Sequence, residues 1–216
     1  MRKSGIVLII MGLLFLMGSA ALLIHNHQED QRAGIAAGEQ LSLLVGQIQS
    51  QKEQPTTAPS VEDEVALEQE LRPIEPTPDP AEEAMEEIQV EGNGYIGYLS
   101  FPTLEMDLPV MSDWTVQKLY TAPCHYFGTV QQENLVIMAH NYQRHFGRIT
   151  ELRHGDPVIF VNIFGEAYFY SVELQEILPS NCIPELTAGE YDLTLFTCTY
   201  GGANRITVRC NESDPP

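Results

Sequence analysis

The chain has 216 residues and a formal net charge of −19 at pH 7, a length that one or two domains can fill. The excess of acidic residues argues against a nucleic-acid-binding protein, because such proteins neutralise phosphates with a basic patch. These acidic residues are spread unevenly, so the sequence divides into regions of different character.

The first region is a short basic head, residues 1–4, followed by an apolar segment. Residues 5–24 carry no charge and are rich in Leu, Ile and Met. A helix of this length matches the roughly 30 Å core of a bilayer, and positive charges before it favour a cytoplasmic N-terminus. We predict a single-pass anchor in the cell membrane, with the rest of the chain outside the cell. A signal peptide cleaved near residues 18–21 is the alternative.

Residues 25–54 are polar but periodic. Apolar side chains recur at near-helical spacing, at Ile35, Leu41, Leu43, Leu44, Val45 and Ile48. This pattern predicts a helical stem or a short coiled coil. His25 and His27 are interpreted as markers of the membrane edge.

Residues 55–91 differ in composition from the rest of the chain. They hold twelve acidic residues, six prolines, one arginine and no aromatic residue. Such a segment buries too little apolar surface to offset the loss of chain entropy on folding. We predict a disordered acidic linker that lifts a domain off the membrane, and an acidic docking site is the alternative.

Residues 92–216 are the predicted globular domain. Short apolar runs separated by turn residues occur at 95–101, 108–111, 135–139, 158–163, 167–172 and 174–178, and two further strands are predicted at 192–197 and 205–209. This spacing is typical of an all-β sandwich or barrel. Short helices are predicted at 113–120 and 146–153, the second ended by Gly155.

The last two predicted strands place a thiol beside a guanidinium. Side chains alternate along a strand, so Cys198 shares a face with Thr194 and Phe196, and Arg205 opens the next strand after a glycine-containing loop. Cysteine supplies a nucleophile, and arginine supplies a fixed cation for an oxygen that gains charge. Arg209 lies on the same face about 13 Å further along and is predicted to make a surface or edge pair.

A catalytic base is predicted at His140, which follows the apolar run 134–139 and therefore ends a buried strand. His125 competes for this role because it follows Cys124 directly. Neighbouring side chains on an extended chain point apart, so the pair of His125 and Cys124 is interpreted as accidental.

The run Thr-Leu-Phe-Thr-Cys at 194–198, together with His140 and Arg205, resembles the sortase family of cysteine transpeptidases. Supporting similarity lies at 139–142, 145–147 and 155–156, and the resemblance covers about residues 94–209. The sequence departs from many sortases at Ala139, where they carry glycine before the histidine.

The resemblance implies an eight-stranded sortase-type β-barrel with short peripheral helices. It also implies that Cys198 attacks a sorting-signal peptide of the Leu-Pro-x-Thr-Gly type, that Arg205 stabilises the oxyanion, and that His140 is the general acid and base. A peptidoglycan or pilin amine would accept the acyl group. Contacts with the substrate are expected from the loop 178–191 and from Ala139, Asn141, Thr197, Thr199 and Tyr200.

The other cysteines are Cys124, Cys182 and Cys210. An exported domain permits a disulfide between two of them, free buried thiols are the other outcome, and the sequence does not select a pair. The chain has no Cys-x-x-Cys pair and no convincing acidic cluster in the domain, so we expect neither a metal site nor a cofactor.

The class and the reaction leave alternatives open. The chain ends soon after its last strand without a second apolar segment, and the loop 178–191 is short. We therefore expect a class A-like or class D-like role, with a class B-like one also open. A cysteine peptidase and an inactive anchored binding module are the alternative functions.

Overall fold

The computed structural model describes residues 2–53 and 85–215, with side chains from residue 7 onward. The predicted linker 55–91 therefore falls mostly outside the described residues. The elements in chain order are α1 (Arg2–Glu53), β1 (Ile88–Val90), β2 (Asn93–Phe101), η1 (Pro102–Leu104), β3 (Met106–Met111), α2 (Val116–Leu119), β4 (Cys124–Phe127), β5 (Leu135–Met138), η2 (Phe146–Glu151), β6 (Pro157–Asn162), β7 (Ala167–Pro179), α3 (Ile183–Leu186), β8 (Leu193–Cys198) and β9 (Asn204–Glu212).

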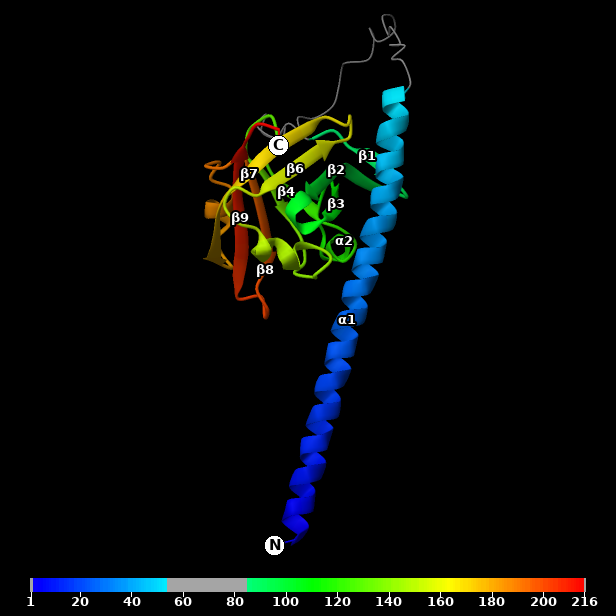
Figure 1. Cartoon of the computed structure of the whole chain (residues 1–216), viewed down its shortest axis with the longest axis vertical. Coiled ribbons are helices and arrows are strands. Elements are labelled where there is room, and N and C mark those ends of the chain that lie inside the picture. Colours follow the sequence, from blue (N-terminus) through cyan, green and yellow to red (C-terminus); the bar gives the residue numbers. More distant parts are fainter. Residues whose placement is uncertain (1, 54–84, 216) are drawn as a thin grey trace, which may run out of the picture.

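The strands form a closed barrel, which confirms the predicted fold class (Figure 1). The eight strands of the ring follow the order β2-β3-β4-β5-β8-β9-β7-β6, and pairing of β2 with β6 closes it. The β3–β4 and β5–β8 pairs are parallel and the other pairs of the ring are antiparallel. Strand β1 adds to the outside of the ring by pairing with β2. Closure leaves few unpaired backbone groups for other chains to join.

Alternation along the strands divides the side chains between the inside and the outside of the barrel. The inner side chains are fully buried and make one continuous core, which includes Leu99, Phe101, Val110, Leu135, Ile137, Phe160, Leu193, Leu195 and Val208. Burial of this much apolar surface is the main stabilising contribution to the domain.

The outside of the barrel is covered on one side by the C-terminal half of α1 (Figure 1). Leu44 and Ile48 are buried there against Tyr95, Met111 and Cys124. Further polar contacts join the two parts: the Lys52 amino group donates to the Gly165 carbonyl at 2.7 Å, and Gln40 bonds Glu91 and Tyr95. The predicted stem is therefore helical, and it is a packed part of the domain.

The N-terminal half of α1 extends away from the barrel (Figure 1). Its large apolar side chains, from Val7 to Ile24, are exposed. By length and composition this part of the helix is able to cross a membrane, in agreement with the prediction for residues 5–24.

The structure differs from the sequence prediction at three short elements. Strand β1 lies inside the range predicted as linker, because its Val90 is buried under α1. Helix α2 is shorter than predicted, since its N-cap is Thr115, whose hydroxyl accepts the Lys118 amide hydrogen at 3.1 Å. The predicted helix at 146–153 is a 3-10 helix, η2, that ends at Glu151.

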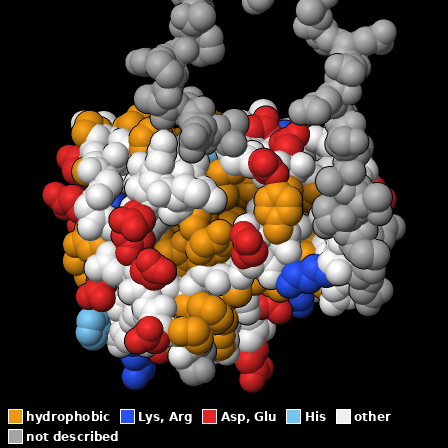
Figure 2. Space-filling model, turned by 90° about the horizontal axis from the view of Figure 1, so that it is seen from above, with side chains coloured by type: hydrophobic (Ala, Val, Ile, Leu, Met, Phe, Trp, Pro, Cys, Tyr) orange, Lys and Arg blue, Asp and Glu red, His pale blue; other side chains and the backbone are white. Residues whose placement is uncertain are grey.

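The end of the barrel opposite the N-terminus presents a mixed surface (Figure 2). Apolar side chains gather in the middle of this face, and acidic side chains lie around them (Figure 2). Strand β8 ends at the other end of the barrel, on the side of the N-terminal half of α1 (Figure 1).

Candidate functional site

Strand β8 carries the candidate nucleophile at its last position. Its inward side chains, Leu193, Leu195 and Thr197, are almost completely buried. Cys198 lies on the outward face with Phe196 and is partly exposed, with a free thiol. Alternation of a strand whose other face fills the core therefore fixes the outward direction of this thiol.

The parallel pairing of β5 and β8 brings His140 to the same edge of the barrel. Met138 pairs with Phe196, so His140 and Cys198 each follow this pair by two residues and point to the same face. Two hydrogen bonds hold the strand ends together: the Ala139 amide donates to the Phe196 carbonyl at 3.2 Å, and the Thr197 hydroxyl donates to the Ala139 carbonyl at 2.8 Å. Register therefore brings together two residues that are distant in the sequence.

His140 and Cys198 line one cavity of about 520 Å³. One part of its wall comes from the loops that follow β5 and β8. The other part comes from α1. The lining residues are Asn26, His27, Glu29, Asp30, His140, Asn141, Tyr142, Gln143, Cys198, Thr199, Tyr200, Gly201 and Gly202.

Aromatic rings hold the His140 imidazole in place. Its ring centroid lies 4.9 Å from that of Tyr120 and 5.1 Å from that of Tyr142. His140 Nε2 is buried and has no hydrogen-bond partner among the described residues. Burial lowers the pKa of His140, and the Glu29 carboxylate on α1 partly opposes this effect. The imidazole is therefore neutral at neutral pH and able to accept a proton.

His145 and His125 differ from His140 in their surroundings. His145 is fully buried, packs against Tyr142, and burial lowers its pKa to about 4. His125 lies within 2.7 Å of the Gly128 carbonyl through Nε2 and lines a different cavity. Neither residue lines the cavity that holds Cys198.

Arg205 lies directly opposite Cys198 in the antiparallel pair of β8 and β9. Residues in such a pair present their side chains on the same face. The Arg205 guanidinium donates to the carbonyls of Gly202 and Asn204, at 3.1 and 3.2 Å. It is next to the cavity but is not one of its lining residues.

Arg209 corrects one sequence prediction. It was expected to make a surface or edge pair, but it is 4% exposed. Its guanidinium bonds the Glu176 carboxylate at 2.8 Å, the Thr194 hydroxyl at 3.0 Å and the Glu185 carbonyl at 2.8 Å. The segment around α3 lies over this part of the sheet and buries the arginine. The local sequence pattern of β9 does not predict that a distant segment covers it.

The five expected substrate contacts separate into two groups. Asn141, Thr199 and Tyr200 line the cavity, and Tyr200 is highly exposed. Ala139 and Thr197 do not line it, because both are buried between the strands. Their mutual hydrogen bond places them as residues that position the strand ends.

Sequence reasoning missed the contribution of α1 to this cavity. His27 was interpreted as a marker of the membrane edge, and no role was assigned to Asn26, Glu29 or Asp30. The Asp30 carboxylate accepts the Arg144 amide hydrogen at 3.1 Å, which fixes this part of α1 to the loop after His140. The sequence contained one sign of this contact, since five of the six residues at 33–38 are Ala or Gly, and Ala33 and Ala37 are buried where the helix meets the barrel.

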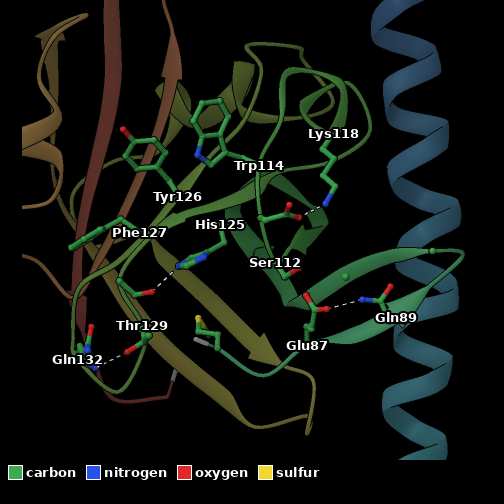
Figure 3. A pocket seen from close by; sticks show the side chains of 15 residues that line it. Glu87, Gln89, Ser112, Trp114, Lys118, His125, Tyr126, Phe127, Thr129 and Gln132 are labelled. Atoms are coloured by element: carbon green, nitrogen blue, oxygen red, sulfur yellow. Dashed lines mark hydrogen bonds and ion pairs between the residues drawn. The ribbon is translucent and has the colours of Figure 1, made fainter. Parts of the chain in front are cut away.

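A larger cavity of about 800 Å³ lies elsewhere on the barrel (Figure 3). Trp114 and Tyr126 lie on one side of it and Glu87 on another (Figure 3). Tyr126 also packs edge-on against Phe196, with ring centroids 5.2 Å apart. This cavity contains neither His140 nor Cys198, so the smaller cavity is the better candidate for covalent chemistry.

All four cysteines, Cys124, Cys182, Cys198 and Cys210, are free. Burial raises the pKa of Cys124 to about 12 and that of Cys210 further still. Thiolate formation is therefore unfavourable at these two positions. Cys198 differs from the other three because they are buried and it is partly exposed.

Comparison with known proteins agrees with this geometry. A model of the sortase domain matches residues 99–213. Among solved structures, sortase A from Corynebacterium diphtheriae shares 21% identity at a TM-score of 0.50, over 57% of this chain and 63% of that one. Sortase C1 from Streptococcus agalactiae shares 24% identity at a TM-score of 0.52, over 59% and 72% of the two chains.

A third structure is a Clostridium perfringens sortase C with the C-terminal cell wall sorting motif, at 25% identity and a TM-score of 0.51, covering 61% of this chain and 74% of that one. The chain thus spans less than two thirds of the Corynebacterium structure. A comparison with curated proteins gives no significant match. Because the family model covers more than half of the chain, the chain belongs to the sortase family.

Proposed function

We propose that this protein is a membrane-anchored transpeptidase that cleaves a sorting-signal peptide and transfers the acyl part to a cell-wall or pilin amine. The observation that supports this most strongly is that Cys198 and His140 line one cavity, with Arg205 opposite the cysteine in the strand register. The apolar half of α1 would be the anchor, with a cytoplasmic N-terminus and the barrel outside the cell.

In the first half of the reaction, Cys198 Sγ attacks the carbonyl carbon of the scissile amide and the thiol proton passes to His140. The C–N bond then breaks as the imidazolium gives this proton to the departing amine. A thioester remains on Cys198. The neutral resting state of His140 suits it to receive the proton at the start of this sequence.

In the second half, an acceptor amine attacks the thioester carbon and loses a proton to His140. The C–S bond breaks and Cys198 regains a proton, so the enzyme returns to its starting state. Arg205 would stabilise both oxyanions by exchanging its bonds to the Gly202 and Asn204 carbonyls for bonds to the substrate oxygen. Asn141, Thr199 and Tyr200 would contact the peptide on either side of the scissile bond.

The test uses the full chain in detergent with a Leu-Pro-x-Thr-Gly peptide, with and without an added amine. We expect an amine-dependent product and a thioester at Cys198, detected by mass spectrometry of the trapped protein. Hydrolysis that is indifferent to the amine would identify a peptidase instead. Equal labelling of the parent and of Cys198→Ala by a thiol-reactive substrate analogue would identify an inactive binding module.

The class A-like or class D-like assignment stays part of this proposal. Helix α3 and its flanking turns make the connection between β7 and β8 short, which supports a site without a long covering helix. Turnover of peptides that differ in the sorting motif would test the class. A preference for a pilin amine over a cell-wall amine would contradict it.

A further inference from the structure

The membrane-spanning part of α1 and the catalytic cavity belong to one continuous helix. The apolar segment ends at Ile24, and the first α1 residue that lines the cavity is Asn26. The last is Asp30. On a helix that rises about 1.5 Å per residue, these positions lie about 3 and 9 Å beyond Ile24. The polar headgroup layer on each side of a bilayer is about 5–8 Å thick, so the cavity wall begins at this level.

The barrel is not free to move away from this position, because α1 is bound to it along much of its length. Asp30 bonds the Arg144 amide near the cavity. Leu44 and Ile48 are buried further along, and the Lys52 amino group donates to Gly165 near the C-terminal end of the helix. Contacts spread from residue 30 to residue 52 fix both the height and the tilt of the barrel relative to the helix axis.

This arrangement changes the role expected for the acidic segment 55–91. A spacer lifts a domain off the membrane only when it lies between the membrane and that domain. Here the chain passes from the apolar segment directly into a helix that contacts the barrel, and the acidic segment follows the helix in the sequence. The height of the cavity is therefore set by α1.

From these observations we propose that α1 holds the catalytic cavity against the membrane at the level of the lipid headgroups, and thereby sets how far from the bilayer surface a scissile bond can lie. Figure 1 shows the corresponding geometry, with the N-terminal half of α1 extending beyond the barrel. The choice of substrate rests on the proposed function. The position of Cys198 does not depend on that function and is tested separately.

The position is measured on the full chain in lipid nanodiscs, with a thiol-reactive fluorophore on Cys198 and a quencher on the lipid headgroups. The other cysteines are buried, so labelling selects Cys198. The matched control carries Cys198→Ser and Phe164→Cys, because Phe164 is exposed in the turn between β6 and β7. We expect strong quenching at residue 198 and weak quenching at residue 164. Equal quenching at both positions would overturn the proposal.

A second variant changes only the height of the catalytic cavity above the membrane. Seven helix-forming residues inserted between Ile24 and His25 add two turns, which keep the helix face and lengthen α1 by about 10 Å. Quenching at Cys198 is expected to fall severalfold. Unchanged quenching would show that α1 does not set the height of the cavity.

The consequence for substrates is tested with sorting-signal peptides joined to a membrane helix through spacers of increasing length. The parent is expected to favour the shortest spacers. The insertion variant is expected to favour spacers that are about three residues longer, since an extended residue spans about 3.3 Å, with turnover of a soluble peptide unchanged. The same spacer optimum in both proteins would overturn the proposal. Loss of soluble-peptide turnover in the parent would instead refute the proposed function.

Discussion

Two places along the β8–β9 pair have a similar arrangement of residues but different surroundings: the open end at Cys198 and Arg205, and the closed end at Thr194 and Arg209. At one end Cys198 pairs with Arg205, and four residues away on the same face Thr194 pairs with Arg209. Arg209 is buried and is bonded by a carboxylate, a hydroxyl and a carbonyl, with its guanidinium 5.3 Å from the centre of the Tyr191 ring. Among the residues that the structure describes, the Arg205 guanidinium bonds two backbone carbonyls, those of Gly202 and Asn204 at the start of β9.

The difference shows how one sheet supports both structure and chemistry. A buried guanidinium must have its charge and its donors satisfied within the protein, and these bonds keep it fixed. A guanidinium at the open end keeps bonds that water or a substrate can replace. The comparison predicts that changes at the open end affect catalysis and that changes at the closed end affect stability.

The largest effect is expected from Cys198→Ala at the open end. The variant lacks the proposed nucleophile, so transfer should fall to the background rate while the unfolding midpoint stays the same. The measurement is product formation from a sorting-signal peptide together with thermal unfolding. Cys182→Ala is the matched control because Cys182 is buried beside Leu186 and lies outside the cavity. A Cys182→Ala protein without activity would contradict the assignment of the nucleophile.

Arg205→Ala should have the next largest effect. Removing one oxyanion donor lowers kcat by about 10²–10³-fold, and a comparable loss is expected here. Stability should change by less than about 0.5 kcal/mol, as for most partly exposed positions. Steady-state kinetics and urea unfolding measure the two quantities. A variant that unfolds easily but turns over normally would assign Arg205 to structure.

Arg209→Met should show the opposite behaviour. Breaking a buried ion pair costs about 3–5 kcal/mol, and we expect about 3 kcal/mol because the Glu176 side chain is 35% exposed and regains water. The kcat of the folded protein should be unchanged. Urea unfolding measures the loss, and Arg209→Lys should recover only part of it because lysine lacks the planar fork. Equal kinetic losses in Arg205→Ala and Arg209→Met would abolish the distinction between the two ends.

The smallest effect is expected from Glu29→Gln, which tests whether α1 takes part in the open end. The Glu29 carboxylate favours the protonated form of His140, so its removal should lower the pKa of His140 further. The acidic limb of the rate profile should then move to lower pH, and an NMR titration of the imidazole should shift in the same direction. Glu39→Gln is the control because Glu39 is exposed on α1 outside the cavity. Identical shifts in both variants would exclude a specific role for Glu29.

Much of the site could be predicted from the sequence because it depends on strand periodicity. The alternation along 194–198 and 205–209 places Cys198 and Arg205 on one face, and the observed register agrees. The apolar run before His140 predicts a strand, and β5 ends two residues before it. Pairing of β5 with β8 then places His140 and Cys198 side by side.

The sequence misled us where the neighbours of a residue come from distant segments. Arg209 has the same local pattern as Arg205, and only the coverage by Glu176, Glu185 and Tyr191 makes it structural. Likewise, Ala139 and Thr197 flank the candidate catalytic residues His140 and Cys198 in the sequence, but they are buried between strands and bond each other.

The sequence by itself determined the apolar segment, the helical stem, the barrel strands and the catalytic candidates, because each depends on the order of side chains within a short stretch. The tertiary structure decided where the stem lies. Burial of Ala33, Ala37, Leu44 and Ile48 against the barrel brings Glu29 and Asp30 into the wall of the cavity. The free energy of that contact comes from apolar surface shared between segments that are distant in the chain, and the pattern of either segment alone does not identify its partner.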